Sequence, residues 1–106
     1  MKARFAAYAV GAVGFIVETT DPDGEAREQD EQAWREGIAR FSEQTDFIEV
    51  DVLDSEEEGD EAFVTFAARL ERGGEDASFT ERSRFRRIDG RWFYSSGEQL
   101  DDEDTR

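Results

Sequence analysis

The 106-residue chain is long enough for one modest hydrophobic core and too short for two, which predicts a single domain. Apolar residues make up only 37% of it, but nine Phe, two Trp and two Tyr indicate a folded, largely aromatic core, because a disordered chain is poor in these residues. The absence of Cys and His excludes disulfides, thiol nucleophiles, zinc sites built from these residues and any catalytic arrangement that needs a His, so carboxylates, Tyr or Lys2 must carry any acid–base chemistry.

The charge is strongly negative, with 28 acidic and 13 basic residues and a formal net charge of −15. All the basic residues except Lys2 are arginines. Because the chain lacks a basic footprint, we expect no nucleic-acid partner. An acidic surface with little lysine favours a protein adapted to a salt-rich cytoplasm. The other interpretation is an ordinary acidic protein from a genome rich in G and C, which also favours Arg over Lys.

The salt-rich interpretation makes a direct prediction about thermal stability. Repulsion among like charges destabilises the folded state, and molar salt shortens the screening length to about 3 Å, from about 10 Å at 0.1 M. We therefore expect the melting temperature to rise when KCl is increased from dilute buffer to 1 M, as measured by tryptophan fluorescence. A melting temperature that does not rise would contradict adaptation to salt.

An apolar stretch covers residues 5–17, but it is too short for a membrane span and is interrupted by Gly11 and Gly14. No cleavage site of a secretory signal peptide stands out after it. We therefore expect a cytoplasmic protein without a membrane partner. The stretch is assigned to two helices, the first over residues 2–10 and the second over residues 13–18.

Residues 19–24 predict a loop, because Asp21-Pro22 is a turn-initiating pair and Gly24 follows two residues after the Pro. A third helix is predicted over about residues 25–43. Its acidic start suits the positive end of the helix dipole. Trp34, Ile38 and Phe41 form an apolar line along its second half, which we assign to the core.

Alternating apolar and polar residues then predict four strands. They cover residues 47–53, 62–71, 79–88 and 91–95, and the connections are an acidic turn over 54–61, Gly73-Gly74 and Asp89-Gly90. In the first strand, Ile48, Val50 and Val52 are expected to share one face. Helices followed by an antiparallel meander define an α+β fold, in which N-terminal helices pack on a curved sheet and leave a cone with one open end.

The two ends of the chain resemble the middle domain of the YchJ-like protein family. Residues 1–9, MKARFAAYA, resemble that domain's M-R-x-R-[YF]-x-A-Y start, and residues 81–94 resemble its E-R-S-x-F … G-R-W-x-Y block. The likeness covers about residues 1–97 and implies a nuclear-transport-factor-2-like cone over residues 1–98, with an acidic disordered tail over residues 99–106. The Cys-rich zinc motifs that flank this domain in the family have no counterpart here, so the resemblance carries over no zinc site.

The third predicted strand holds the candidate site. Phe79, Glu81, Ser83 and Phe85 share one face, and because the two Phe residues seek the core, Glu81 and Ser83 should face the concave, apolar side. A carboxylate there is costly unless it is paired, hydrogen-bonded or protonated, which makes it a candidate for a pocket. Other aromatic residues could line the same cavity: Tyr8, Trp34, Trp92 and Tyr94. The alternative is a Glu81 that bonds an internal Tyr, Trp or Arg and only orders the core.

Two charged features allow a structural or a functional interpretation. The stripe Arg82, Arg84 and Arg86 on the opposite face is either a site for an acidic partner or pairs with acids such as Glu49 and Asp51. Three acidic runs lack the alternating ligand positions of a calcium loop and are interpreted as solvated surface. These runs lie at residues 21–24, 54–61 and 101–104.

Three classes of function remain open. The first is a non-catalytic module, without metal or cofactor, that binds an unknown small molecule or protein through its conical pocket. The second is a small cofactor-free isomerase or hydrolase with Glu81 as general acid or base. The third is an adaptor that docks through the arginine stripe. A homodimer through the outer face of the sheet is compatible with the resemblance, and the fold does not decide among these classes.

Overall fold

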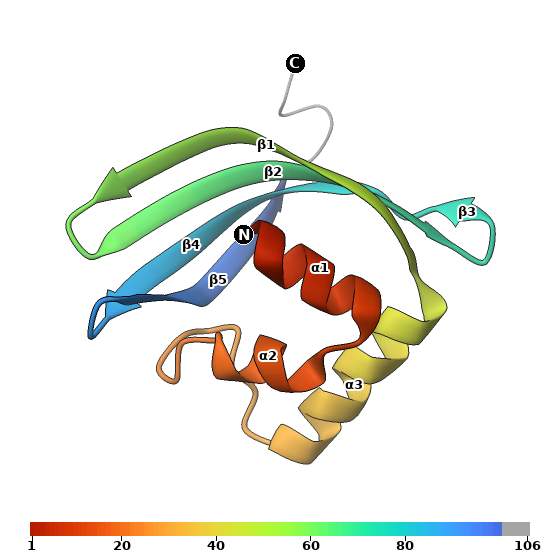
Figure 1. The fold of residues 1–106 in the computed structure, drawn as a ribbon, viewed down its shortest axis with the longest axis horizontal. Coiled ribbons are helices and arrows are strands. Elements are labelled where there is room, and N and C mark those ends of the chain that lie inside the picture. The colour runs from red at the N-terminus through yellow and green to blue at the C-terminus, as the bar shows by residue number, and fades with distance from the viewer. Residues whose placement is uncertain (101–106) are drawn as a thin grey trace.

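Three helices come first in the chain and an antiparallel sheet follows, so that the helices lie against the concave face of the sheet (Figure 1). The computed structural model describes residues 1–100. Its helices are α1 (Lys2–Val10), α2 (Val13–Glu18) and α3 (Glu31–Gln44). Its strands are β1 (Asp46–Glu58), β2 (Glu61–Arg72), β3 (Glu75–Asp76), β4 (Phe79–Ile88) and β5 (Arg91–Leu100). The α+β class and the order of helices and strands are confirmed.

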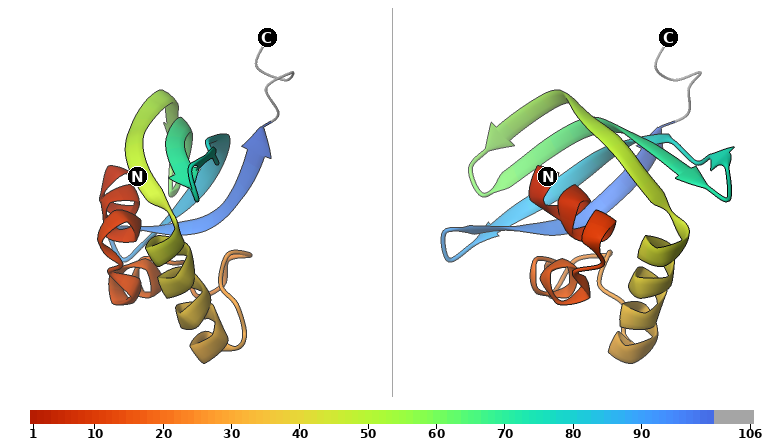
Figure 2. Two further views of the ribbon diagram at one scale, coloured as in Figure 1. Left: turned by 90° about the vertical axis from the view of Figure 1, so that its right-hand side faces the viewer. Right: turned by 45° about the vertical axis from the view of Figure 1, so that its right-hand side comes forward.

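The strands are arranged as β1-β2-β4-β5, with the two-residue β3 paired to β2, and the sheet is not closed into a barrel. It curves over α1, and the β1–β2 and β4–β5 hairpin ends extend beyond the helices (Figure 2). The predicted Asp89-Gly90 turn is present, and both residues have the positive φ (51° and 82°) that a type I′ turn requires. The helices therefore cover only part of the concave face.

The predicted start of the third helix is wrong. The helix begins at Glu31, because the Asp30 carboxylate accepts a hydrogen bond from the backbone N–H of Ala33 (3.0 Å) and caps the first turn. Arg27, which lies before the cap, instead donates to the backbone carbonyls of Val17 (3.2 Å) and Thr20 (3.3 Å). The residues before Asp30 therefore fasten the loop to α2.

The predicted first turn is also wrong, because β1 continues through the acidic run to Glu58 and the turn contains only Gly59 and Asp60. Pairing with β2 stabilises this extended conformation despite the low strand propensity of acidic residues. Likewise β5 continues past residue 95 to Leu100, so residues 99 and 100 belong to the sheet. The rest of the predicted tail, with the acidic run 101–104, lies outside the described residues.

A register shift near the start of β1 changes which of its residues face inward. The register shifts between Phe47 and Glu49, so Ile48 has no partner on β2 and is 52% exposed. Phe47 takes the inner position, where it packs with Val50 in the sheet part of the core. The prediction that Ile48 shares a face with Val50 is therefore wrong, since one extra residue in a strand reverses its alternation.

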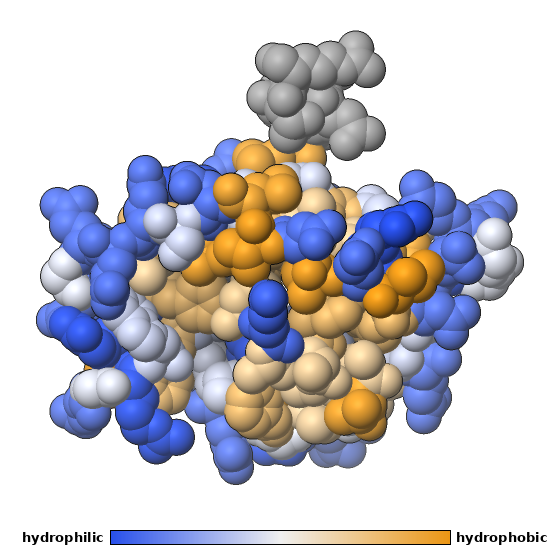
Figure 3. All heavy atoms as spheres, turned by 45° about the horizontal axis from the view of Figure 1, so that its top comes forward, coloured by the Kyte–Doolittle hydropathy of each residue, from blue (hydrophilic) through white to orange (hydrophobic). Residues whose placement is uncertain are grey.

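The core has two parts. Ala7, Ile16, Val17, Trp34 and Ile38 pack among the helices, and a second group centred on Phe66, Ala68 and Leu70 lies on the concave face of the sheet. Among residues 1–100, the large apolar side chains that are exposed are Val10, Phe15, Ile48, Val52, Leu53 and Trp92. Figure 3 shows apolar surface gathered in the middle of one face, with hydrophilic side chains around it.

The arginine stripe is engaged in ion pairs. Arg82 lies 3.6 Å from Glu56, and Arg84 pairs with Glu61. Glu49, which was expected to pair with the stripe, pairs with Arg69 of the neighbouring strand β2 instead (3.3 Å). Exposed pairs of this kind contribute about 0–1 kcal/mol each, but they leave the stripe no surplus of free positive charge.

Asp21 corrects the interpretation of residues 21–24 as solvated surface. Its carboxylate is buried, and its Oδ1 accepts hydrogen bonds from the backbone N–H of Asp23 (2.9 Å) and from Arg86 (2.7 Å). The backbone of Asp21 also donates to the carbonyl of Tyr94 (2.8 Å), so the loop lies along the edge of β5. This buried carboxylate fixes the loop to the sheet and thereby holds α2 in place.

Candidate functional site

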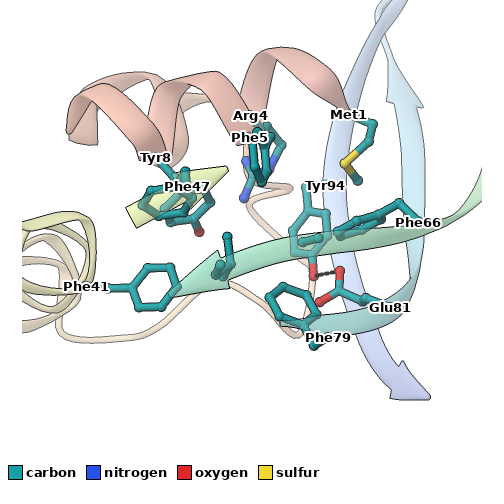
Figure 4. A pocket seen from close by; sticks show the side chains of 12 residues that line it. Met1, Arg4, Phe5, Tyr8, Phe41, Phe47, Phe66, Phe79, Glu81 and Tyr94 are labelled. Atoms are coloured by element: carbon teal, nitrogen blue, oxygen red, sulfur yellow. Dashed lines mark hydrogen bonds between the residues drawn. The ribbon is translucent and has the colours of Figure 1, made fainter. Parts of the chain in front are cut away.

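A cavity of about 160 Å³ lies between α1, the end of α3 and the concave face of the sheet (Figure 4). An apolar cavity of about 150 Å³ can hold a benzene molecule, so this one has room for a single aromatic ring. Eight lining residues are apolar: Met1, Phe5, Phe41, Phe47, Phe66, Ala68, Leu70 and Phe79. The four polar ones are Arg4, Tyr8, Glu81 and Tyr94.

The apolar wall is held together by aromatic rings packed edge to face. The ring centroids of Phe5 and Phe47 lie 5.6 Å apart at 85°, and those of Tyr8 and Phe41 lie 5.8 Å apart at 88°. Each such pair contributes about 0.5–1.5 kcal/mol beyond the area it buries. The rings join α1, α3 and β1, so the cavity is formed by the fold itself.

Glu81 is the acidic group of the cavity. Its Oε2 accepts a hydrogen bond from the Ser83 hydroxyl (2.6 Å) and another from the Tyr94 hydroxyl (3.0 Å). Figure 4 shows the Tyr94 hydroxyl meeting the Glu81 carboxylate at one side of the cavity. Two hydroxyl donors compensate for part of the cost of placing a carboxylate among aromatic rings. Within residues 1–100 both bonds end on Oε2, which leaves Oε1 as an acceptor without a protein donor.

The two tyrosines of the cavity remain protonated over the ordinary pH range. Burial raises the pKa of the Tyr94 hydroxyl strongly, and the charge of Glu81 and the hydrogen bond to it raise it further. Burial likewise raises the pKa of Tyr8, although the nearby Arg4 opposes this effect. Both hydroxyl groups are therefore neutral, and that of Tyr94 donates its proton to Glu81.

Arg4, on α1, is the basic group of the cavity, and sequence reasoning missed it. It is 8% exposed, its guanidinium lies over the Tyr94 ring at 4.4 Å from the centroid, and its Nη1 donates to the Ile16 carbonyl (3.2 Å) and the Thr19 hydroxyl (2.7 Å). Desolvation lowers the pKa of Arg4, but a guanidinium stays charged in proteins. The sequence did contain a signal for this role, because Arg4 and Tyr8 are spaced i, i+4 and so lie on one face of α1.

Gly97 provides the space in which Glu81 and Tyr94 meet. It lies opposite Ser83 in the β4–β5 pairing, and a Cβ at this position would stand 2.6 Å from Glu81 Oε2 and overlap the Tyr94 hydroxyl oxygen. Any side chain here would push the two groups apart. The sequence carries no signal for this role, because a Gly near the end of a strand has many possible explanations.

Of the six predicted site residues, the structure places four at the cavity and two elsewhere. Glu81, Tyr8 and Tyr94 line the cavity, and Ser83 is fully buried behind Glu81, which it orients. Trp34 instead belongs to the core among the helices. Trp92 lies 36% exposed at the hairpin end of the sheet, with the Arg87 guanidinium 5.2 Å from its ring centroid.

A second, wider hollow of about 360 Å³ lies between the hairpin ends of the sheet and the helices α1 and α2. Its apolar lining includes Phe15, Val64, Phe85 and Trp92. Met1 and Arg4 line both this outer hollow and the inner cavity, so the first turn of α1 separates the two. Over the part of the chain described here, no three acidic side chains converge in a way that could hold a metal ion, and no helix is long and apolar enough to cross a membrane.

Helices packed against the concave face of an open, curved sheet, with a cavity between them, define an NTF2-like domain. The chain belongs to the family described as "YchJ, middle NTF2-like domain", whose model matches residues 1–97. This confirms the predicted family.

Three known proteins illustrate the relationship. A UPF0225 protein of Vibrio vulnificus is 37% identical over 105 residues, which are 97% of this chain and 59% of that protein. The solution structure of a SEC-C motif containing protein from Rhodopseudomonas palustris is 40% identical, with a TM-score of 0.77 over 92% of this chain and 73% of that one. An epoxide hydrolase of the LEH-like type from M. tuberculosis has a TM-score of 0.65 over 92% and 76%, but at 13% identity it shows the fold alone. The chain spans about three fifths of the length of the curated relatives it matches.

Proposed function

We propose that this domain binds a small organic molecule in the cavity between α1 and the sheet. The observation that carries the proposal is the Glu81–Tyr94 hydrogen bond at the wall of a cavity whose other lining residues, apart from Arg4 and Tyr8, are Phe, Leu, Ala and Met. Ligand sites commonly combine an apolar lining with a few well-placed polar groups in this way. A Glu81 that only ordered the core would not need an open space beside it.

Thermal melts against a metabolite library test the proposal, with the wild-type protein and Glu81→Gln in parallel. We expect a ligand that raises the wild-type melting temperature and raises that of Glu81→Gln much less, because the amide cannot accept the same charge-assisted hydrogen bonds. Glu98→Gln is the matched control, since Glu98 is an exposed acid of β5 outside the cavity lining, and it should respond like the wild type. The absence of any ligand, together with unchanged stability of Glu81→Gln, would contradict the proposal.

The same cavity supports a second candidate, a small cofactor-free enzyme in which Glu81 is the general acid or base. What favours it is the free Oε1 of Glu81, a carboxylate oxygen that could exchange a proton with a bound molecule. Incubating each ligand found in the melts with wild type and Glu81→Gln, followed by proton NMR of the small molecule, distinguishes the two. Conversion by the wild type alone would establish an enzyme, and an unchanged ligand spectrum would leave a binding module.

A further inference from the structure

Arg4 has more donor capacity than its protein contacts use. A guanidinium offers five N–H donors. Within residues 1–100, the hydrogen bonds of Arg4 to Ile16, Thr19 and Thr20 all leave from Nη1, and Tyr8 is its one further side-chain partner. Among the same residues no carboxylate lies within ion-pair distance of Arg4, although the residue is more than nine-tenths buried. A buried positive charge without a paired anion is costly, so a partner that enters the cavity would stabilise it.

Glu81 is the acidic counterpart of Arg4, and both residues contact Tyr94. Arg4 lies over the face of the Tyr94 ring, and Glu81 accepts a hydrogen bond from the hydroxyl at the end of the same ring. The two opposite charges therefore line one cavity without contacting each other directly (Figure 4). Arg4 has free donors and Glu81 has a free acceptor, and the space between them is bounded by aromatic side chains.

Building on the proposed function, we infer that the cavity selects a single-ring aromatic molecule without net charge that carries a hydrogen-bond acceptor at one end for Arg4 and a donor at the other for Glu81. Such a molecule satisfies both protein charges at once. A simple anion would be attracted by Arg4 and repelled by Glu81. A simple cation would be attracted by Glu81 and repelled by Arg4. The volume of about 160 Å³ suits a ligand whose body is one ring.

The structural role of Arg4 does not account for this arrangement. Its Nη1 bonds to Ile16, Thr19 and Thr20 tie α1 to the end of α2, and they use only one of its three nitrogens. Substitution of Arg4 would also break these bonds and endanger folding. The main experiment therefore varies the ligand and uses the wild-type protein.

Four probes titrated into the wild-type protein by isothermal calorimetry form the test. Phenol has the hydroxyl donor without a carbonyl acceptor, and acetophenone has the carbonyl acceptor without a donor. 4-Hydroxyacetophenone has both groups, and 4-hydroxybenzoate replaces the neutral carbonyl with an anion. We expect 4-hydroxyacetophenone to bind about tenfold more tightly than phenol and acetophenone, which corresponds to one additional hydrogen bond to a charged group. We expect 4-hydroxybenzoate to bind more weakly than 4-hydroxyacetophenone in the wild type, and to recover at least part of the difference in Glu81→Gln.

The possible failures are distinguishable. If 4-hydroxyacetophenone binds no better than phenol and acetophenone, the two-ended selection is overturned while the binding cavity stands. If 4-hydroxybenzoate binds more tightly than 4-hydroxyacetophenone, the ligand class is anionic and the inference is overturned in a different way. If no probe binds and the metabolite library also gives no ligand, the proposed function fails and the inference fails with it.

Discussion

Gly97→Ala is expected to destabilise the protein by about 1–3 kcal/mol and to abolish ligand binding in the cavity, although every polar group of the site remains in the chain. The added methyl group would overlap the Tyr94 hydroxyl and stand 2.6 Å from Glu81 Oε2, so the hydrogen bond between them must break. A rigid phenol ring cannot yield as a flexible side chain would. Because 1 kcal/mol corresponds to about 4–8 °C in a domain of this size, differential scanning calorimetry measures the loss easily.

Gly37→Ala is the matched control for this substitution. Gly37 lies inside α3, where a Cβ would meet no atom within 4 Å. Replacing a helical Gly by Ala is expected to stabilise the protein by about 0.5–1 kcal/mol and to leave binding unchanged. If Gly97→Ala melts like the wild type and binds the same ligand equally well, Glu81 and Tyr94 do not need to be in contact.

Asp21→Asn is expected to destabilise the protein by about 1.5–3 kcal/mol at pH 7, the range for a buried hydrogen bond to a charged group. Burial by itself would raise the pKa of Asp21, but the hydrogen bonds from Asp23 and Arg86 outweigh it and hold the pKa below its ordinary value. A carboxyl with a lowered pKa in the folded state stabilises the protein above the pKa of the unfolded chain, about 3.9. The stabilisation is therefore complete at neutral pH and is lost as the pH falls below about 4.

Urea unfolding of wild type and Asp21→Asn between pH 3 and pH 7 measures this difference. The free energies of unfolding should differ most at pH 7 and converge toward pH 3. Asp23→Asn is the control, because the Asp23 side chain is 82% exposed and meets Arg86 only at 3.4 Å, so the change should stay within about 0.5 kcal/mol. A difference between wild type and Asp21→Asn that does not depend on pH would show that the charge of Asp21 contributes nothing.

Local sequence patterns were sufficient to predict most of the fold. The helices over residues 2–10 and 13–18, the bounds of β4 and the Asp89-Gly90 turn were all predicted, because each depends on residues close together in the chain. The position of Glu81 on the concave side of the sheet followed from strand alternation in the same way. These features are governed by side-chain periodicity and turn chemistry.

Features that depend on pairing between distant segments could not be predicted. The bulge at Ile48 shifts the inward position of β1 to Phe47, and only the register with β2 reveals it. Asp21 resembles any loop acid until the fold brings Arg86 to it from 65 residues away. Gly97 has a function only because Glu81 and Tyr94 meet above it, and no pattern in one sequence encodes such a three-way contact.

Methyl NMR spectra recorded during a titration with 4-hydroxyacetophenone test the central claim, that a small molecule binds between α1 and the sheet. Ala68 and Leu70 have methyl groups in the inner cavity, and Ala62 and Val64 have methyl groups in the outer hollow. The account predicts saturable shifts at Ala68 and Leu70 with little change at Ala62 and Val64. Shifts confined to Ala62 and Val64, or no saturable shift at any of the four, would contradict it.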